Sequence, residues 1–232
     1  MSLAISYTLS LADASPEEAR RRIVALHQGA ARLNLPELGP LIELKGEGIC
    51  QTNADDPLFC VKQGTMSVED YDAFFRNRKA IPSCRQLMGF AAFPGEGSHH
   101  CSFGLAIHAE ESQQWQWHDF CKTQYASNPE KGGLANFIRC HQRVLALLDL
   151  CEELSILSSA SDPSGYRDHR NLEQLVAYVC DANVFTAAAI GCLKDGLETR
   201  GYSAEAPILE RADFEHLEAQ GRLQTPPPAS AN

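Results

Sequence analysis

Alternation of apolar with small or polar residues marks residues 3–9. A period of two is typical of a strand with one buried face. Residues 15–18, Ser-Pro-Glu-Glu, then place Ser at a helix N-cap, Pro at the first helical position and Glu at N3, which is the pattern of a capping box. The chain is therefore expected to open with a strand, followed by a helix from Ser15 to about Leu33.

The middle of the chain contains two longer apolar runs, Leu87 to Phe93 and Ser102 to Ala109. The glycine-containing loop between them favours an antiparallel hairpin. Residues 110–133 hold both tryptophans and many polar groups. We interpret them as a structured loop in which residues 118–121 could form a helical turn. Shorter strands are predicted at Leu41 to Lys45, Leu58 to Lys62, Leu154 to Ser159 and Pro207 to Leu209.

Three further segments have helical periodicity. One starts near Ser67 and ends near Arg78. A second follows Gly132-Gly133 and carries His141 on its apolar face. The last and longest is capped by Asn171 and ends at Gly201. Its predicted buried face consists of Leu172, Val176, Val179, Asn183, Thr186, Ile190, Leu193 and Leu197.

The order of these elements mixes a hairpin with crossover helices, which predicts an α+β fold. We expect one domain over residues 1–223, built on a mixed, largely antiparallel sheet with long helices packed on it. Residues 224–232 are rich in proline and are expected to form a disordered tail.

Composition narrows the possible partners. The 232 residues carry a net charge of −10, so a nucleic acid would be repelled unless a basic patch compensated. No stretch approaches the ~20 apolar residues that a membrane span needs. The nine cysteines include no CxxC pair, and we expect reduced thiols in a cytoplasmic protein. Cys140, Cys151 and Cys180 are expected on buried helix faces.

A first group of reactive side chains is His99-His100-Cys101, with Cys84 upstream. Imidazole and thiolate are preferred zinc ligands. However, structural zinc sites use four ligands, mostly in spaced pairs, and that spacing is missing here. We therefore predict an exposed polar loop and no bound metal.

A second, denser group lies in the segment Trp115 to Asn128. On a helical turn, His118 and Cys121 would share one face, and His118 or Lys122 could lower the pKa of the Cys121 thiol. His141 could serve as a general base if it lined the same cavity. Otherwise the aromatic side chains anchor the segment while its polar groups satisfy the backbone, and His141 and Asn183 are core hydrogen-bonding residues.

The segment from Trp115 to His141, WQWHDFCKTQYASNPEKGGLANFIRCH, resembles a segment of uncharacterised bacterial proteins of similar length. PGEGSHHCSFGL (94–105) and FEHLEAQG (214–221) resemble the same family, so the resemblance covers most of the chain. It implies no activity, cofactor or site residue. Familiar nucleotide, zinc-protease and nucleophile-elbow motifs are absent from the sequence.

Three functions remain open, and the third of them is a metal-dependent protein that uses His99, His100, Cys101 or Cys84. The first is a small-molecule enzyme or binding protein, with no cofactor, whose site lies between residues 115–128 and the helix bearing His141. Its predicted catalytic residues are Cys121, His118 and His141, and its predicted ligand-binding residues are Trp117, Lys122, Tyr125 and Asn128. The second is an acidic interaction protein, of immunity or regulatory type, that binds a basic partner.

Overall fold

The computed structural model describes residues 3–50, 55–65, 84–108 and 114–224. Within these ranges seven strands form one sheet in the order β2-β4-β5-β6-β1-β7, with β3 also paired to β4. Every pair is antiparallel. The strands are β1 (Ala4–Leu11), β2 (Glu37–Leu38), β3 (Ile42–Lys45), β4 (Cys84–Phe93), β5 (Cys101–His108), β6 (Trp115–Lys122) and β7 (Leu157–Ser161).

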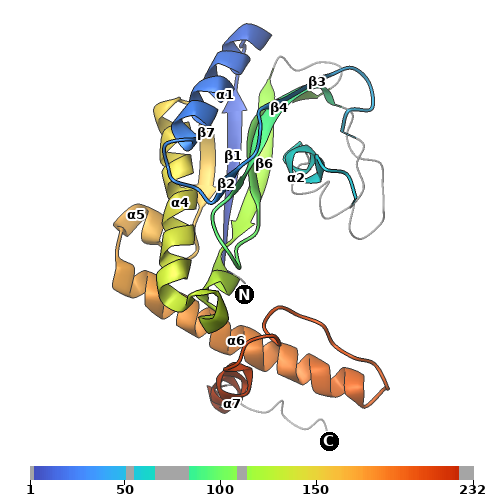
Figure 1. The fold of residues 1–232 in the computed structure, drawn as a ribbon, viewed down its shortest axis with the longest axis vertical. Coiled ribbons are helices and arrows are strands. Elements are labelled where there is room, and N and C mark those ends of the chain that lie inside the picture. The colour runs from blue at the N-terminus through green and yellow to red at the C-terminus, as the bar shows by residue number, and fades with distance from the viewer. Residues whose placement is uncertain (1–2, 51–54, 66–83, 109–113, 225–232) are drawn as a thin grey trace, which may run out of the picture.

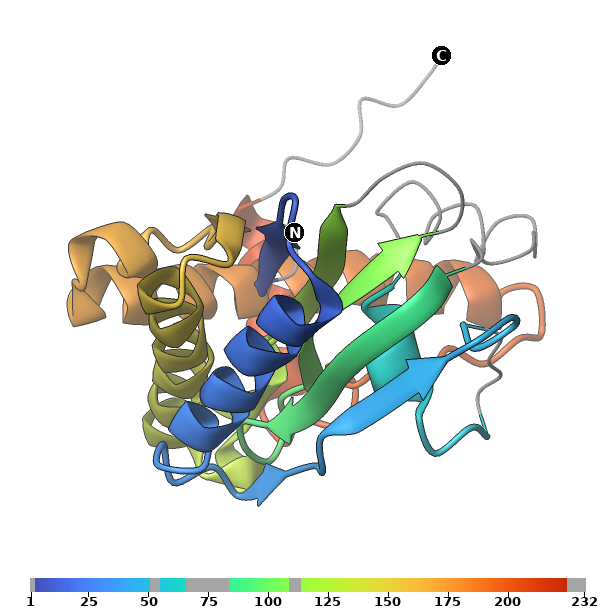
Figure 2. The same ribbon diagram turned by 90° about the horizontal axis from the view of Figure 1, so that it is seen from above.

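Helices cover both faces of the sheet, and this confirms the α+β class. α1 and α4 lie on one face and α2 lies on the other, while α6 crosses one end of the sheet with α7 beside it (Figures 1 and 2). The helices are α1 (Pro16–Ala30), α2 (Phe59–Gln63), α4 (Gly133–Glu153), α5 (Tyr166–His169), α6 (Leu172–Glu198) and α7 (Phe214–Gln224), with 3-10 turns η1 (Gln124–Ser127) and η2 (Pro129–Lys131).

The strand and helix predicted at the N-terminus are confirmed as β1 and α1. The Ser15 hydroxyl accepts a hydrogen bond from the Glu18 N–H at 3.2 Å. The Glu18 carboxylate, however, does not complete a capping box and pairs with Arg21 and Arg22. The buried face of α1 packs on β4 and β5. There the rings of His27 and Phe90 are in edge-on contact, with their centres 4.9 Å apart.

The predicted hairpin is confirmed as β4 and β5, which pair from Cys84 with His108 to Ala92 with Cys101. The long helix after Gly132 is confirmed as α4. The helix predicted at 67–78 and the tail from Thr225 lie outside the described residues.

Three local predictions are wrong. Residues 58–62 lie in helix α2 and its N-cap, residues 115–122 form strand β6, and residues 207–209 form a turn. For β6 the physical reason is tertiary. Its backbone pairs with β1 along all eight residues, and this ladder overrides the mixed polarity that suggested a loop.

The predicted buried face of α6 is correct at Val179 and Asn183 but wrong at Leu172 and Leu193. Its buried residues are Leu175, Val179, Ala182, Asn183, Val184, Ala187, Ala188 and Gly191. Leu172 and Leu193 are 44% and 54% exposed, and Cys180, expected to be buried, is exposed as well. α6 is apolar on most sides, so periodicity alone could not identify the face that meets the body. α7 packs on one of these sides, where Gly221 leaves no space for a β-carbon against Val184 and Ala188.

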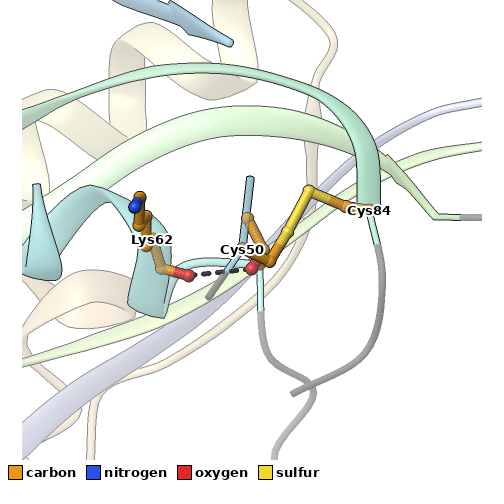
Figure 3. The surroundings of a disulfide bond; sticks show 4 residues. Cys50, Lys62 and Cys84 are labelled. Atoms are coloured by element: carbon orange, nitrogen blue, oxygen red, sulfur yellow. Dashed lines mark hydrogen bonds between the residues drawn. A yellow bond between two sulfur atoms is a disulfide. The ribbon is translucent and has the colours of Figure 1, made fainter. Parts of the chain in front are cut away.

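Cys50 and Cys84 form a disulfide, so the expectation that every cysteine is a reduced thiol is wrong. Figure 3 shows the bond beside Lys62 of α2. It joins the segment after β3 to the first residue of β4 and spans 34 positions of the chain. Both residues are buried, with 2% and 1% of their surface exposed.

Among the described residues, one helix is long and apolar enough to cross a membrane by length and composition. It is α6, which the search for an apolar run in the sequence did not single out. Its most apolar window has a mean hydropathy of 1.6, and 39% of that window is buried within the protein.

Candidate functional site

The predicted cluster at residues 115–128 is divided by β6 between two faces of the sheet. Successive strand residues point to opposite faces, so His118 and Cys121 do not share a face as they would on a helical turn. The Nδ1 atom of His118 lies 3.0 Å from the hydroxyl of Thr8 on β1. The Cys121 thiol is fully buried and donates to the carbonyl of His99 at 3.2 Å. The proposed thiol–imidazole pair is therefore not brought together.

Trp117 is a packing residue that fills an opening in the sheet. β5 and β6 pair only at Ala106 with Gln116 and at Ile107 with Trp115. Beyond these pairs the indole N–H of Trp117 donates to the carbonyl of Ser102 at 3.1 Å. The ring lies so close to Gly64, Gly89 and Gly104 that none of the three positions has space for a β-carbon.

Asp119 is a buried carboxylate that sequence reasoning did not single out. It accepts hydrogen bonds from the N–H and the hydroxyl of Ser102, both at 2.6 Å, and from the N–H of Phe120 at 2.7 Å. Burial raises the pKa of Asp119 to about 6, although hydrogen bonds from Ser102 and Phe120 oppose the rise. These bonds replace part of the missing ladder between β5 and β6.

Tyr7 and several thiols surround this carboxylate. The Tyr7 hydroxyl donates to the Ser102 carbonyl at 2.7 Å, and its ring stacks on Phe103. Burial, with the charge of Asp119, raises the pKa of Tyr7 well above its ordinary value. The Cys101 thiol is in hydrogen-bond contact with Cys121, and this contact, together with burial, raises its pKa. The raised pKa values keep the Tyr7 hydroxyl and the Cys101 thiol in their protonated, unreactive forms.

His141 takes part in a buried relay with two other residues. Its Nδ1 atom lies 3.1 Å from the hydroxyl of Thr123, and its Nε2 atom lies 3.2 Å from the carboxylate of Asp162. Burial tends to raise the pKa of Asp162, but hydrogen bonds from His141, Ser164 and the Arg167 N–H outweigh it and lower the pKa to about 2.

The order of hydroxyl, imidazole and carboxylate resembles the arrangement that activates a nucleophile. A nucleophile, however, must meet its substrate. Thr123 and His141 are fully buried, and the Asp162 side chain is 1% exposed. The relay connects the end of β6 to α4 and to the loop after β7. While it stays buried, it can hold these three segments together.

Asn183 belongs to a second buried network, in agreement with the core role considered from the sequence. Its carbonyl accepts from Gln124 at 3.1 Å, and its amide donates to the Ser127 hydroxyl at 2.9 Å. Arg211 donates to the same hydroxyl at 3.1 Å and forms a bidentate pair with Asp213. The network attaches α6 and the segment before α7 to η1.

The remaining predicted ligand-binding residues serve local contacts. The Lys122 ammonium lies 5.7 Å from the centre of the Phe120 ring. Tyr125 packs against a small apolar cluster of Ala187, Ile208 and Phe214. The Asn128 side chain accepts from the Glu130 N–H at 3.2 Å and caps η2.

Two hollows formed by described residues lie elsewhere. One of about 430 Å³ lies beside Trp115 at the start of α1, and another of about 420 Å³ lies along the outer side of α1. Neither is lined by His118, Cys121 or His141.

The histidine–cysteine loop is also divided. His100 stacks on Phe93 with ring centres 4.6 Å apart. Cys101 is fully buried as the first residue of β5, and Cys84 forms the disulfide with Cys50. Within the described ranges, no three His, Cys, Asp or Glu side chains are grouped as metal ligands.

An exposed apolar stripe on α6 is the feature that sequence reasoning missed. Phe185, 56% exposed, is followed by exposed Ala189, Cys192 and Gly196, at the i, i+4, i+7, i+11 spacing of a helix-packing face. We call these four residues the α6 seam. Leu193 extends the seam on one side. The spacing is visible in the sequence, but it is masked there by the apolar residues of the other α6 faces.

Comparison of this chain with protein-family models, with curated proteins and with solved structures finds no match.

Proposed function

We propose that this protein is an interaction module that binds a basic protein partner through the outward face of α6. The observation that carries the proposal is the α6 seam, an apolar surface on a helix whose opposite side is fixed to the body by Asn183. Contiguous exposed apolar surface is a common mark of a protein-binding site. Phe185 and Leu193 are the two large side chains that would enter the interface.

The charge around the seam favours a basic partner. Residues 172–224 contain nine acidic and four basic residues. Three of the four basic residues, Lys194, Arg211 and Arg222, already pair with carboxylates. Carboxylates without an ion pair among the described residues are Glu173, Asp181, Glu205, Glu210 and Glu215. Such an excess attracts Lys and Arg side chains at the rim of an interface.

We favour this function over a small-molecule site at residues 115–128. Asp119, Thr123, Gln124 and Ser127 of that segment already form buried hydrogen bonds with Ser102, His141 and Asn183, and a ligand would have to displace them. Each displaced buried hydrogen bond costs about 1–3 kcal/mol. Among the described residues, the α6 seam side chains make no such hydrogen bonds that a partner would have to break.

The test measures binding of the protein to two synthetic peptides, one of Leu and Lys and one of Leu and Glu, by calorimetry. The basic peptide should bind and the acidic one should not. Leu193→Glu should weaken binding about tenfold, because a carboxylate enters the apolar contact. Leu172→Glu is the matched control, since it adds the same charge to an exposed leucine of α6 outside the seam and should not weaken binding.

A result in which Leu193→Glu binds the basic peptide as well as, or better than, the unmodified protein would defeat the proposal. Added negative charge strengthens a purely electrostatic association, so that outcome would mean that the seam takes no part. Binding to neutral phosphatidylcholine vesicles that Leu193→Glu abolishes would also defeat it, because the face would then be a membrane-contacting surface.

A further inference from the structure

We infer that the partner element which docks on the α6 seam is itself an amphipathic α-helix with a basic rim; this inference rests on the proposed function. The spacing of the α6 seam residues indicates the secondary structure of the partner, which the exposed area alone does not. Apolar residues separated alternately by four and three positions lie along a line that a second helix can follow at a shallow crossing angle. A strand or an irregular loop would present side chains at a different period.

The sizes of the seam residues support close helix approach. Phe185 is a bulky knob at one end, while Ala189, Cys192 and Gly196 form a low ridge that continues from it. Outside its own turn of helix, a β-carbon built at Gly196 meets no atom within 4 Å, so the backbone is open to a partner at that turn. Small residues let two helix axes come to the short end of the 8–10 Å range, and a large side chain of the partner can lie over the glycine.

Charge decides between a basic helix and a second copy of this chain. Asp181 and Asp195 lie two heptads apart on the flank of the α6 seam that faces α7. Asp195 pairs with Arg222 of α7, whereas Asp181 has no ion pair among the described residues and is the carboxylate left for a partner. A second copy would bring the same carboxylates and its own net charge of −10 against them, which is unfavourable. A helix with Lys or Arg beside its apolar stripe meets the same flank with opposite charge.

The closing experiment compares two basic peptides of identical Leu and Lys composition. One arranges leucines with heptad spacing, so that it forms an amphipathic helix, and the other alternates Leu and Lys, so that it forms an amphipathic strand. The heptad peptide should bind at least about tenfold more tightly. Phe185→Glu and Gly196→Leu should each weaken its binding about tenfold, while Leu172→Glu should not.

Gly196→Leu keeps the test independent of folding. Leucine is a better helix former than glycine and has open space at this position, so the melting temperature should not fall. A loss of binding with an intact melting transition therefore reports on the seam alone.

The outcomes separate the two proposals. If both basic peptides bind equally and more tightly than the Leu–Glu peptide, the helical partner is refuted while the interaction function stands. If no basic peptide binds better than the acidic one, the proposed function itself fails. Sedimentation that finds a dimer, dissociated by Phe185→Glu, would overturn the basic helix in favour of a second copy.

Discussion

The carbonyl oxygen of Gly64, at the end of α2, accepts a hydrogen bond from the backbone N–H of His118 in β6 at 2.9 Å. This bond occupies a position on β6 where pairing with β5 has ended. α2 therefore covers the opening in the sheet on the face opposite α1 (Figure 1). The Trp117 ring lies against Gly64 in the space between α2 and the sheet.

Gly64→Ala should lower the free energy of unfolding by about 1–3 kcal/mol, as overpacking in a core usually does. The φ of Gly64 is −62°, so alanine suits the backbone and the cost comes from collision with the Trp117 ring. Gly196→Ala is the matched control, because its β-carbon meets nothing within 4 Å. It should stabilise the helix by about 0.5–1 kcal/mol. Urea unfolding measures both values, and equal effects would contradict the packing described for Trp117.

Asp119 should make the protein less stable as pH rises. Its folded pKa of about 6 lies above the ordinary value of 3.8. Its contribution is therefore fully present below pH 4 and is lost as pH rises through 6, by about 3 kcal/mol in all. Asp119→Asn cannot ionise, so its unfolding free energy should decline less between pH 4 and pH 7. Parallel curves for the two proteins would show that Asp119 titrates normally.

The Cys50–Cys84 disulfide should contribute strongly to stability. Closing a loop with a sequence separation of 34 stabilises a folded chain by roughly 4 kcal/mol in the chain-entropy model. Replacing both cysteines with serine should therefore lower the urea midpoint under non-reducing conditions. If the disulfide of the unmodified protein is reduced beforehand under unfolding conditions, the unmodified protein and the double serine variant should have nearly the same urea midpoint. Intact mass with and without reductant, after alkylation, tests directly whether the bond forms.

Thiol reactivity should follow exposure. Cys192 and Cys180 are exposed, whereas Cys101, Cys121, Cys140 and Cys151 are buried. Burial and the charge of Asp181 raise the pKa of Cys180, so Cys192 should be alkylated first. Brief treatment with iodoacetamide followed by peptide mass spectrometry gives the order. Rapid labelling of Cys151 in the native protein would contradict the core packing of α4.

Sequence periodicity alone determined those strands and helices whose apolar residues face the core and whose polar residues face the solvent. Residues 3–9 alternate cleanly, so β1 could be predicted from side chains alone. Ser15 and Pro16 satisfy local backbone geometry, so the start of α1 could be placed to the residue. The same holds for the β4–β5 hairpin and α4, and these elements together sufficed for the α+β class.

Only the tertiary structure decided the elements whose local hydrophobic pattern does not match the burial of their residues. β6 buries Asp119 because Ser102 of β5 supplies two hydrogen-bond donors to its carboxylate, and no local period encodes that partner. The group predicted around Cys121 was dispersed because a strand separates side chains that a helical turn would gather. On α6 the apolar residues point in most directions, so the packing of η1 and α7 selected the buried face and left Phe185 exposed. The sequence supplied every residue of the α6 seam, but only packing could show which apolar face had been left uncovered.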